Sequence, residues 1–150
     1  MAGQPLPISH PRLQRLYAYW SAKKGQRKMP SRADIDVLDL RYVMGNMMLV
    51  DVIGGSPLRF RIRLHGSHLS QRAGYELTGK MLDELPETDF RKEVRERWTE
   101  VATTGEPLHC DKNFQVFDGR PYHYESIVLS LSADGETVNM ELVGLIYHDP

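Results

Sequence analysis

Residues 47–66 read MMLVDVIGGSPLRFRIRLHG, and this stretch decides the fold. The apolar run Met47–Ile53 has the length of a strand, and residues 54–57 supply Gly, Ser and Pro for a turn. Residues 58–64 then alternate apolar side chains with Arg59, Arg61 and Arg63. The stretch therefore predicts a β-hairpin.

Helical patterns follow this hairpin. Residues 66–73 allow about two helical turns before Gly74 ends them, and Gly79 interrupts the next segment. The pattern of residues 88–104 places five apolar side chains on one helical face and stops at Gly105. These five are Phe90, Val94, Trp98, Val101 and Ala102. We expect an insert of short helices and loops that ends in one long helix.

The rest of the chain has strand patterns. Residues 107–117, 122–131 and 138–147 are alternating or β-branched, and Asp118-Gly119 and Asp134-Gly135 lie between them. Such pairs favour tight hairpins, so the three strands are expected to form a meander.

On the other side of the first hairpin, an amphipathic helix is predicted between Pro11 and Gly25. Its apolar stripe is Leu13, Leu16, Tyr17 and Trp20. The stripe packs either on the sheet or on a second copy of the chain, and periodicity does not separate these cases. Residues 25–36 are polar and are predicted to form a surface linker.

Together the elements predict an α+β fold. A five-stranded antiparallel sheet, with the first strand beside the last, carries the helical insert between strands 2 and 3 over one face. The N-terminal helix and linker occupy residues 1–36, and the sheet domain occupies residues 37–150.

Composition narrows the function. The chain has 19 Lys and Arg residues and 20 Asp and Glu residues, so it has no net positive charge to attract nucleic acid. The basic stretch 23–28 is expected to be a solvated helix end. The longest apolar run is far shorter than a membrane span, and the N-terminus has no signal-peptide pattern. The lone Cys110 excludes an internal disulfide. We therefore expect a cytoplasmic protein with no membrane insertion, in which Cys110 is inert.

Several segments, taken together, carry a family resemblance. They are Tyr19-Trp20, GQR at 25–27, MPSRADID at 29–36, LVDV at 49–52, FRIRLHGS at 60–67 and GYELTGK at 74–80. This succession resembles a bacterial family of stand-alone, single-domain PAS proteins and covers most of the chain. Two positions depart from the family pattern. His65-Gly66-Ser67 stands where a small or apolar residue, Gly and Thr are expected, and Leu129-Ser130-Leu131 stands where Leu-Pro-Leu is common.

The resemblance implies a sensory module with a PAS-like domain at residues 37–150. A cavity is expected between the sheet and the insert, and a signal is expected to pass through the sheet or the N-terminal helix to a partner. PAS domains hold haem, flavin, small metabolites or nothing, so the resemblance leaves the cofactor unknown. The insert contains no cysteine, which argues against cysteinyl flavin photochemistry.

Six residues are candidates for contact with a small-molecule ligand: Arg63, His65, Tyr75, Trp98, Tyr122 and Tyr124. His65 ends the second strand beside the insert, and Arg63 lies two residues earlier on the same strand face. Each has a structural alternative. If His65 does not contact a ligand, it is a partly exposed histidine at a strand end. If Arg63 does not, it pairs with a nearby Asp or Glu, and the aromatic residues are then part of the core.

Other chemistry has weaker support. The remaining histidines show no metal-ligand spacing, and His68 is the candidate axial ligand if haem is bound. An isomerase-like enzyme needs His65 together with Asp111 or Glu125, and no nucleophile or phosphate-loop motif is present.

The leading prediction is therefore a sensory domain that binds a small ligand and associates with a signalling protein. A homodimer is predicted through Leu13, Leu16, Tyr17 and Trp20. The alternatives are the isomerase-like enzyme and a ligand-free structural adaptor.

Overall fold

A five-stranded antiparallel sheet runs through the middle of the structure, a computed structural model that describes residues 6–74, 76–115 and 121–148. Side chains are described for all of these residues except 113–115, 121 and 122. The strands are β1 (Met47–Ile53), β2 (Arg59–His65), β3 (Leu108–Gln115), β4 (Pro121–Leu131) and β5 (Met140–Tyr147). Their order is β2-β1-β5-β4-β3, which confirms the hairpin, the meander and the pairing of the first strand with the last. The predicted turn Asp118-Gly119 lies outside the described residues.

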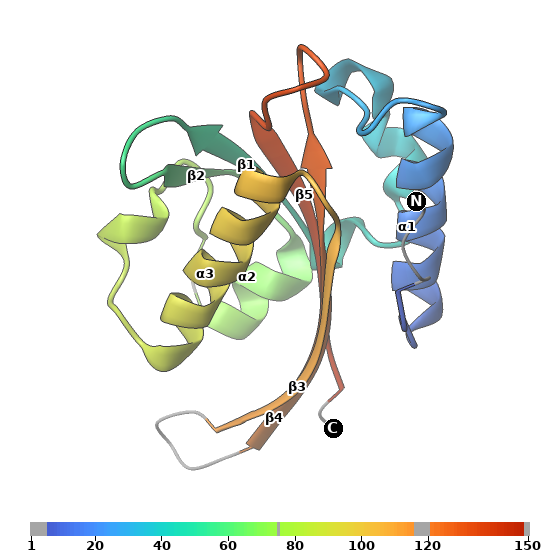
Figure 1. Cartoon of the computed structure of the whole chain (residues 1–150). Coiled ribbons are helices and arrows are strands. Elements are labelled where there is room, and N and C mark those ends of the chain that lie inside the picture. Colours follow the sequence, from blue (N-terminus) through green and yellow to red (C-terminus); the bar gives the residue numbers. More distant parts are fainter. Residues whose placement is uncertain (1–5, 75, 116–120, 149–150) are drawn as a thin grey trace.

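Helices cover both faces of this sheet. Figure 1 shows α1 (Pro11–Lys24) on one face and α2 (Ser67–Ala73) with α3 (Asp89–Thr104) on the other. We call the first the α1 face. The second is the insert face, because residues 66–107 between β2 and β3 cover it. Short 3-10 turns at Arg32–Asp34, Val37–Leu40, Met44–Asn46 and Leu82–Glu84 complete the connections.

Local signals explain where α3 begins and ends. Thr88 Oγ1 accepts a hydrogen bond from the Arg91 backbone N–H at 3.0 Å, as a helix N-cap does. Gly105 has a φ of 75°, the left-handed conformation that ends helices and that glycine adopts without strain. Within the described residues, no helix combines the length and the hydrophobicity that crossing a bilayer requires.

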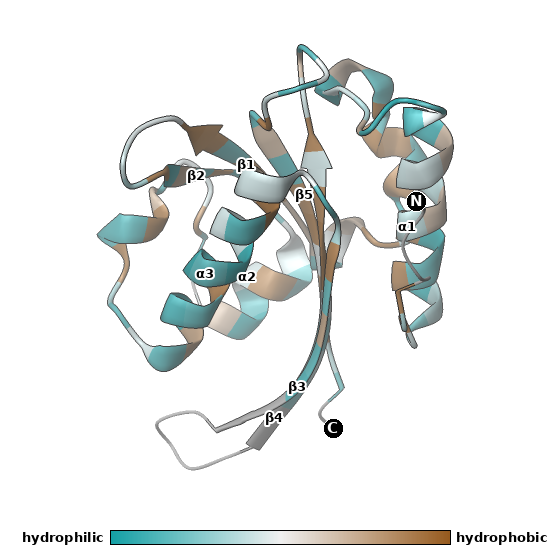
Figure 2. Ribbon diagram, viewed as in Figure 1, coloured by the Kyte–Doolittle hydropathy of each residue, from teal (hydrophilic) through white to brown (hydrophobic). Residues whose placement is uncertain are grey.

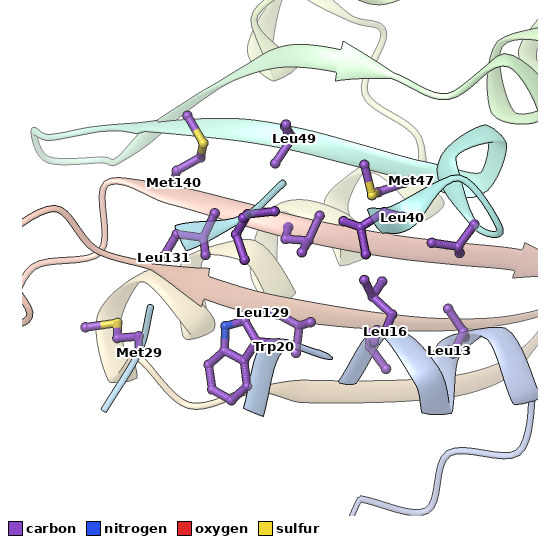
Figure 3. Close-up of a cluster of buried hydrophobic side chains, with 14 of the residues drawn as sticks. Leu13, Leu16, Trp20, Met29, Leu40, Met47, Leu49, Leu129, Leu131 and Met140 are labelled. Atoms are coloured by element: carbon purple, nitrogen blue, oxygen red, sulfur yellow. The ribbon is translucent and has the colours of Figure 1, made fainter. Parts of the chain in front are cut away.

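The α1 face is closed by the stripe of α1, as Figure 3 shows. Leu13 and Leu16 are 0% exposed, and Trp20 is 2% exposed. Gly144 on β5 makes room for them, because a Cβ at this position would lie 2.7 Å from Leu13 Cδ2. Trp20 Nε1 donates a hydrogen bond to the carbonyl of Ser130 on β4 at 2.8 Å.

This packing corrects the predicted dimer contact. The stripe was expected to pack either on the sheet or on a second copy of the chain. In the structure, Leu13, Leu16 and Trp20 pack on the chain's own sheet. They offer no surface to a second copy. Tyr17 is half-buried and stacks on Trp20, with ring centroids 6.0 Å apart.

The connection after α1 joins the same core. Met29 is 1% exposed and Ile35 is 4% exposed, and both pack with α1 and the sheet. The prediction of a surface linker at residues 25–36 is therefore wrong for these two positions. Isolated apolar side chains anchor this polar segment to the sheet. The prediction missed them because it used the average polarity of the segment.

On the insert face, α3 presents Trp98 and Val101 to the sheet. In Figure 2 this helix is mostly hydrophilic, with hydrophobic residues recurring along it. Trp98 meets Phe60 of β2 edge to face, with ring centroids 5.7 Å apart. The apolar side chains of the strands, including Val50 and Val143, complete this second core.

A β-bulge in the first hairpin decides which β2 side chains reach the insert. Val50 pairs with Ile62, but Leu49 pairs with Leu64, so Arg63 is an extra residue in β2. The alternation of faces shifts at this point. Met48 and His65, which pair beyond the bulge, both lie on the insert face.

Candidate functional site

His65 lies where the sequence predicted it, at the end of β2 and against the insert. It is 8% exposed, and its Nδ1 accepts a hydrogen bond from the Leu77 backbone N–H at 3.3 Å. Glu76 Oε1 lies 3.6 Å from the same nitrogen. Burial lowers the pKa of His65 from its ordinary value of 6.5, against the opposing attraction of Glu76. A neutral imidazole in this position holds the insert loop to β2.

Arg63 does not join His65. The bulge places it with Arg61 beside Asp51 of β1, whose Oδ1 lies 2.9 Å from Arg63 Nε. Asp51 lies on the α1 face in the alternation of β1, so Arg63 and His65 point to different sides of the sheet. The prediction that they share a face is wrong because it assumed a regular strand, and the alternative of a structural ion pair describes Arg63.

Trp98 and Tyr124 both lie in the aromatic layer of the insert face. Tyr124 is 0% exposed, and its ring meets Phe90 edge to face at 5.6 Å and Tyr147 at 6.1 Å. Arg97 Nη2 donates a hydrogen bond to the Tyr124 hydroxyl at 2.7 Å. Burial raises the pKa of Tyr124 above its ordinary value of 10. Both candidates are therefore core side chains that pack between the sheet and α3.

The structure does not describe the side chains of the two other aromatic candidates, Tyr75 and Tyr122. Tyr75 is not among the described residues, and the side chain of Tyr122 is not described.

Glu141 is the group on the insert face that sequence reasoning missed. It is 0% exposed, and neither carboxylate oxygen has a hydrogen-bond partner among the described residues. It follows Met140 in β5, between Val50 of β1 and Ser130 of β4 in the register. Desolvation raises the pKa of Glu141 well above its ordinary value of 4.5. Burial therefore favours the neutral form of this acid in the folded protein.

A signal for Glu141 was present in the sequence. Val143, Leu145 and Tyr147 alternate on the insert face of β5, and Glu141 continues this series at a position that burial requires to be apolar. A charged residue at a core position of a strand breaks the local pattern, and in natural proteins such breaks are typical of functional sites.

The polar neighbour of Glu141 is already engaged. Ser130 Oγ donates its hydrogen bond to the Gly105 carbonyl at 2.7 Å, at the end of α3. The insert face therefore combines an aromatic and aliphatic layer with Glu141, whose protonated form has an O–H donor and a carbonyl acceptor to offer.

The catalytic combination considered for an isomerase does not assemble. Glu125 accepts hydrogen bonds from the backbone of Ser9 and His10, which precede α1, so it lies on the α1 face. Asp111 pairs directly with Glu125 across β3 and β4 and shares that face. The sheet thus separates both acids from His65.

His68, the candidate axial ligand for haem, is held through one ring nitrogen. Its Nδ1 lies 2.9 Å from Asn46 Oδ1, and its ring lies against Gly45, where an added Cβ would be 2.9 Å away. Among the described residues, no group of three or more His, Cys, Asp and Glu side chains is arranged to hold a metal ion.

Solved structures share the fold at low sequence identity. The LOV protein of Rhodobacter sphaeroides is 14% identical, with a TM-score of 0.52 over 74% of this chain and 66% of that chain. This chain thus spans slightly less than two thirds of that protein's length. The PAS domain of BvgS from Bordetella pertussis is 17% identical, with a TM-score of 0.55 over 76% of this chain and 87% of that chain. No curated protein matches the sequence.

The sequence itself carries the assignment to a family. A family model described as a PAS domain matches residues 8–147. The match takes in α1, both halves of the sheet and the insert between them. The sheet order β2-β1-β5-β4-β3 and the helical insert agree with it. The chain therefore belongs to the PAS domain family.

Proposed function

We propose that this PAS domain is a sensory domain that binds a small ligand between the sheet and the insert and acts through association with a signalling protein. The observation that supports ligand binding is the state of Glu141, a fully buried carboxyl group without a hydrogen-bond partner among the described residues. A buried polar group without a hydrogen bond costs stability, and an apolar residue at the same position would avoid that cost. A ligand that pairs with Glu141 removes the cost.

The surroundings of Glu141 favour one class of ligand. The layer is apolar and aromatic, and the neighbouring Ser130 hydroxyl is already bonded to Gly105. We therefore expect a largely apolar molecule with a hydrogen-bond donor and an acceptor at one edge, which a protonated carboxyl group complements. Cysteinyl flavin chemistry is not part of the proposal. Residues 66–104 contain no cysteine, and Cys110 lies on β3.

Native mass spectrometry and an absorption spectrum of freshly purified protein test the ligand. We expect a bound mass, or a coloured species, that is absent in Glu141→Leu although the variant stays folded. Glu136→Leu, at an exposed loop position, is the matched control and should keep the bound species. A wild-type protein that carries no bound mass and is not stabilised by any compound of a metabolite set would favour the ligand-free adaptor.

Association forms the second part of the proposal, with a second copy of the chain and a signalling protein as the partners. The buried α1 stripe is not the surface, so the proposed homodimer uses another face. Light scattering over a range of concentrations tests the homodimer, because a dimer has twice the chain's mass of 17.2 kDa. A mass that stays at 17.2 kDa at all concentrations would remove the homodimer from the proposal.

We also propose a cytoplasmic location, which the lone Cys110 supports because reducing compartments keep thiols free. Cell fractionation of the tagged protein tests it.

A further inference from the structure

Four histidines gather around Glu125 on the α1 face, at the end of the sheet away from the turn between β4 and β5. His109 comes from β3, His123 from β4, His148 follows β5, and His10 precedes α1. The ring centroids of His123 and His148 are 4.6 Å apart, and those of His10 and His148 are 6.0 Å apart. Four separate segments of the chain thus bring titratable groups to one place.

Glu125 is the anchor in this cluster. It is 0% exposed, and its Oε2 accepts hydrogen bonds from the Ser9 backbone N–H and from His109 Nε2, both at 2.7 Å. Its Oε1 accepts a bond from the His10 backbone N–H at 2.8 Å. One carboxylate of β4 therefore holds the segment in front of α1 against the sheet.

His10 adds a second tie, and this one depends on its protonation state. Its Nδ1 accepts a hydrogen bond from the Arg12 backbone N–H at 3.1 Å, so the imidazole is the N-cap of α1. Only an unprotonated nitrogen accepts such a bond. Protonation at Nδ1 would set one N–H against another and remove the cap.

The surroundings of His10 oppose its protonation. Burial comes first, followed by the Arg12 guanidinium and by His148, and together they lower the pKa of His10 from 6.5 against the attraction of Glu125. The remaining ionisable groups of the cluster already have partners. His109 pairs with Glu125, His123 Nε2 lies 2.5 Å from Asp111 Oδ1, and His148 Nε2 lies 3.9 Å from Glu125 Oε1.

We propose that the cluster is a pH-dependent latch, in which acidification protonates His10 and releases the segment of residues 6–10 and the first turn of α1 from the sheet. The latched state binds fewer protons at His10 than the released state. It is therefore fully favoured above about pH 6.5 and loses that advantage as the pH falls below it. Release would uncover Ile8 and Leu13, which are 8% and 0% exposed. The device lies on the face opposite Glu141 and does not depend on a ligand there.

Amide hydrogen exchange by NMR on the full chain tests the latch. At pH 7.5 and pH 5.0 we would compare the protection of the Ser9, His10 and Arg12 amides after correction for intrinsic exchange rates. We expect about tenfold less protection at pH 5.0, which is the order of effect that the loss of one helix N-cap has. The Val101 amide in α3 should stay protected and reports on global stability. Equal protection of the three amides at both pH values would overturn the proposal.

The His10→Asn variant is the matched control, because asparagine caps helices without titrating in this range. It should keep the Arg12 amide protected at both pH values. A loss of protection in this variant as large as in the wild type would show that His10 is not the trigger. A direct NMR titration of the His10 ring in the wild-type protein needs no variant, and a pKa above 6.5 there would equally contradict the proposal.

Discussion

Glu125 and Glu141 are both fully buried acids on neighbouring strands, and their surroundings drive them to opposite states. Glu125 accepts two backbone N–H bonds and one from His109, and these outweigh desolvation and lower its pKa. Glu141 has only desolvation, so its pKa rises. Both side chains are 0% exposed, but Glu141 is more deeply surrounded and has no donor to offset its desolvation. The balance between desolvation and the donors that face the carboxyl group sets the direction of each pKa shift.

The free energy of unfolding should therefore rise in Glu141→Leu. The raised pKa means that Glu141 carries no ionisation penalty well below pH 4.5 and costs increasing stability as the pH rises above that value. We expect a gain of about 1–3 kcal/mol at pH 8, where the buried acid is most costly, and a smaller gain at pH 4.5. Urea unfolding at the two pH values measures it. Lower stability of the variant at pH 8 would show that the carboxyl group has a stabilising partner.

At the scale of elements, α1 is a structural layer of the domain. Its stripe is as deeply buried as the strands beneath it, whereas Leu38, in the turn at Val37–Leu40, is 62% exposed. Leucine side chains in this part of the chain thus include fully buried ones, such as Leu13 and Leu16, and a largely exposed one, Leu38.

This contrast gives a matched pair of variants. Leu16→Ala should lower the free energy of unfolding by about 2–5 kcal/mol, because it leaves a cavity between α1 and β5. Leu38→Ala should change stability by less than about 0.5 kcal/mol. Neither change should alter the mass in solution. A change of mass in Leu16→Ala at full stability would instead restore the stripe as an intermolecular contact.

The turn from β2 into α2 depends on a close approach of two backbone segments. A Cβ on Gly66 would lie 2.4 Å from the Gly45 carbonyl oxygen and 2.6 Å from that of Met44, and backbone atoms do not move aside cheaply. Here glycine is required by the contact, since its φ of −59° suits any residue.

Gly66→Ala should therefore destabilise the fold by about 1–3 kcal/mol, as other overpacked sites do. Gly54→Ala is the control, because nothing lies within 4 Å of the added methyl group. Thermal unfolding of both variants measures the difference. Equal melting temperatures would mean that the loop at Met44–Asn46 moves freely away from Gly66.

For the whole molecule, acid stability should depend strongly on Glu125. Its lowered pKa contributes stability that is present above pH 4.5 and is lost as the pH falls through the folded-state value. In Glu125→Gln the unfolding free energy at pH 7 should fall by about 1–3 kcal/mol, because a buried donor loses its partner, and its acid dependence should flatten. Chemical unfolding between pH 3 and pH 7 tests this. A curve parallel to that of the wild type would place the acid-labile group elsewhere.

The sequence predicted most of the architecture, because turn chemistry and periodicity are local. The hairpin turns and the helix stop at Gly105 are properties of a few adjacent residues, and the sheet order follows from pairing their apolar faces. The bulge at Leu49 and Val50 was out of reach, since it depends on how two strands fit, and Arg63 was placed wrongly as a result. The grouping of His10, His109 and Glu125 likewise depends on chain segments that meet only in the folded protein.

The pairing of β1 with β5 also sets the time at which the chain is able to fold. On the ribosome, the first hairpin emerges early, but the inner edge of β1 has no strand to bond until Met140–Tyr147 has left the exit tunnel. Until then the nascent chain carries an open strand edge and two uncovered apolar surfaces, the features that recruit chaperones and drive aggregation. Synthesis as far as β5 therefore precedes closure of the sheet, and any pause in translation before β5 prolongs the interval of greatest risk.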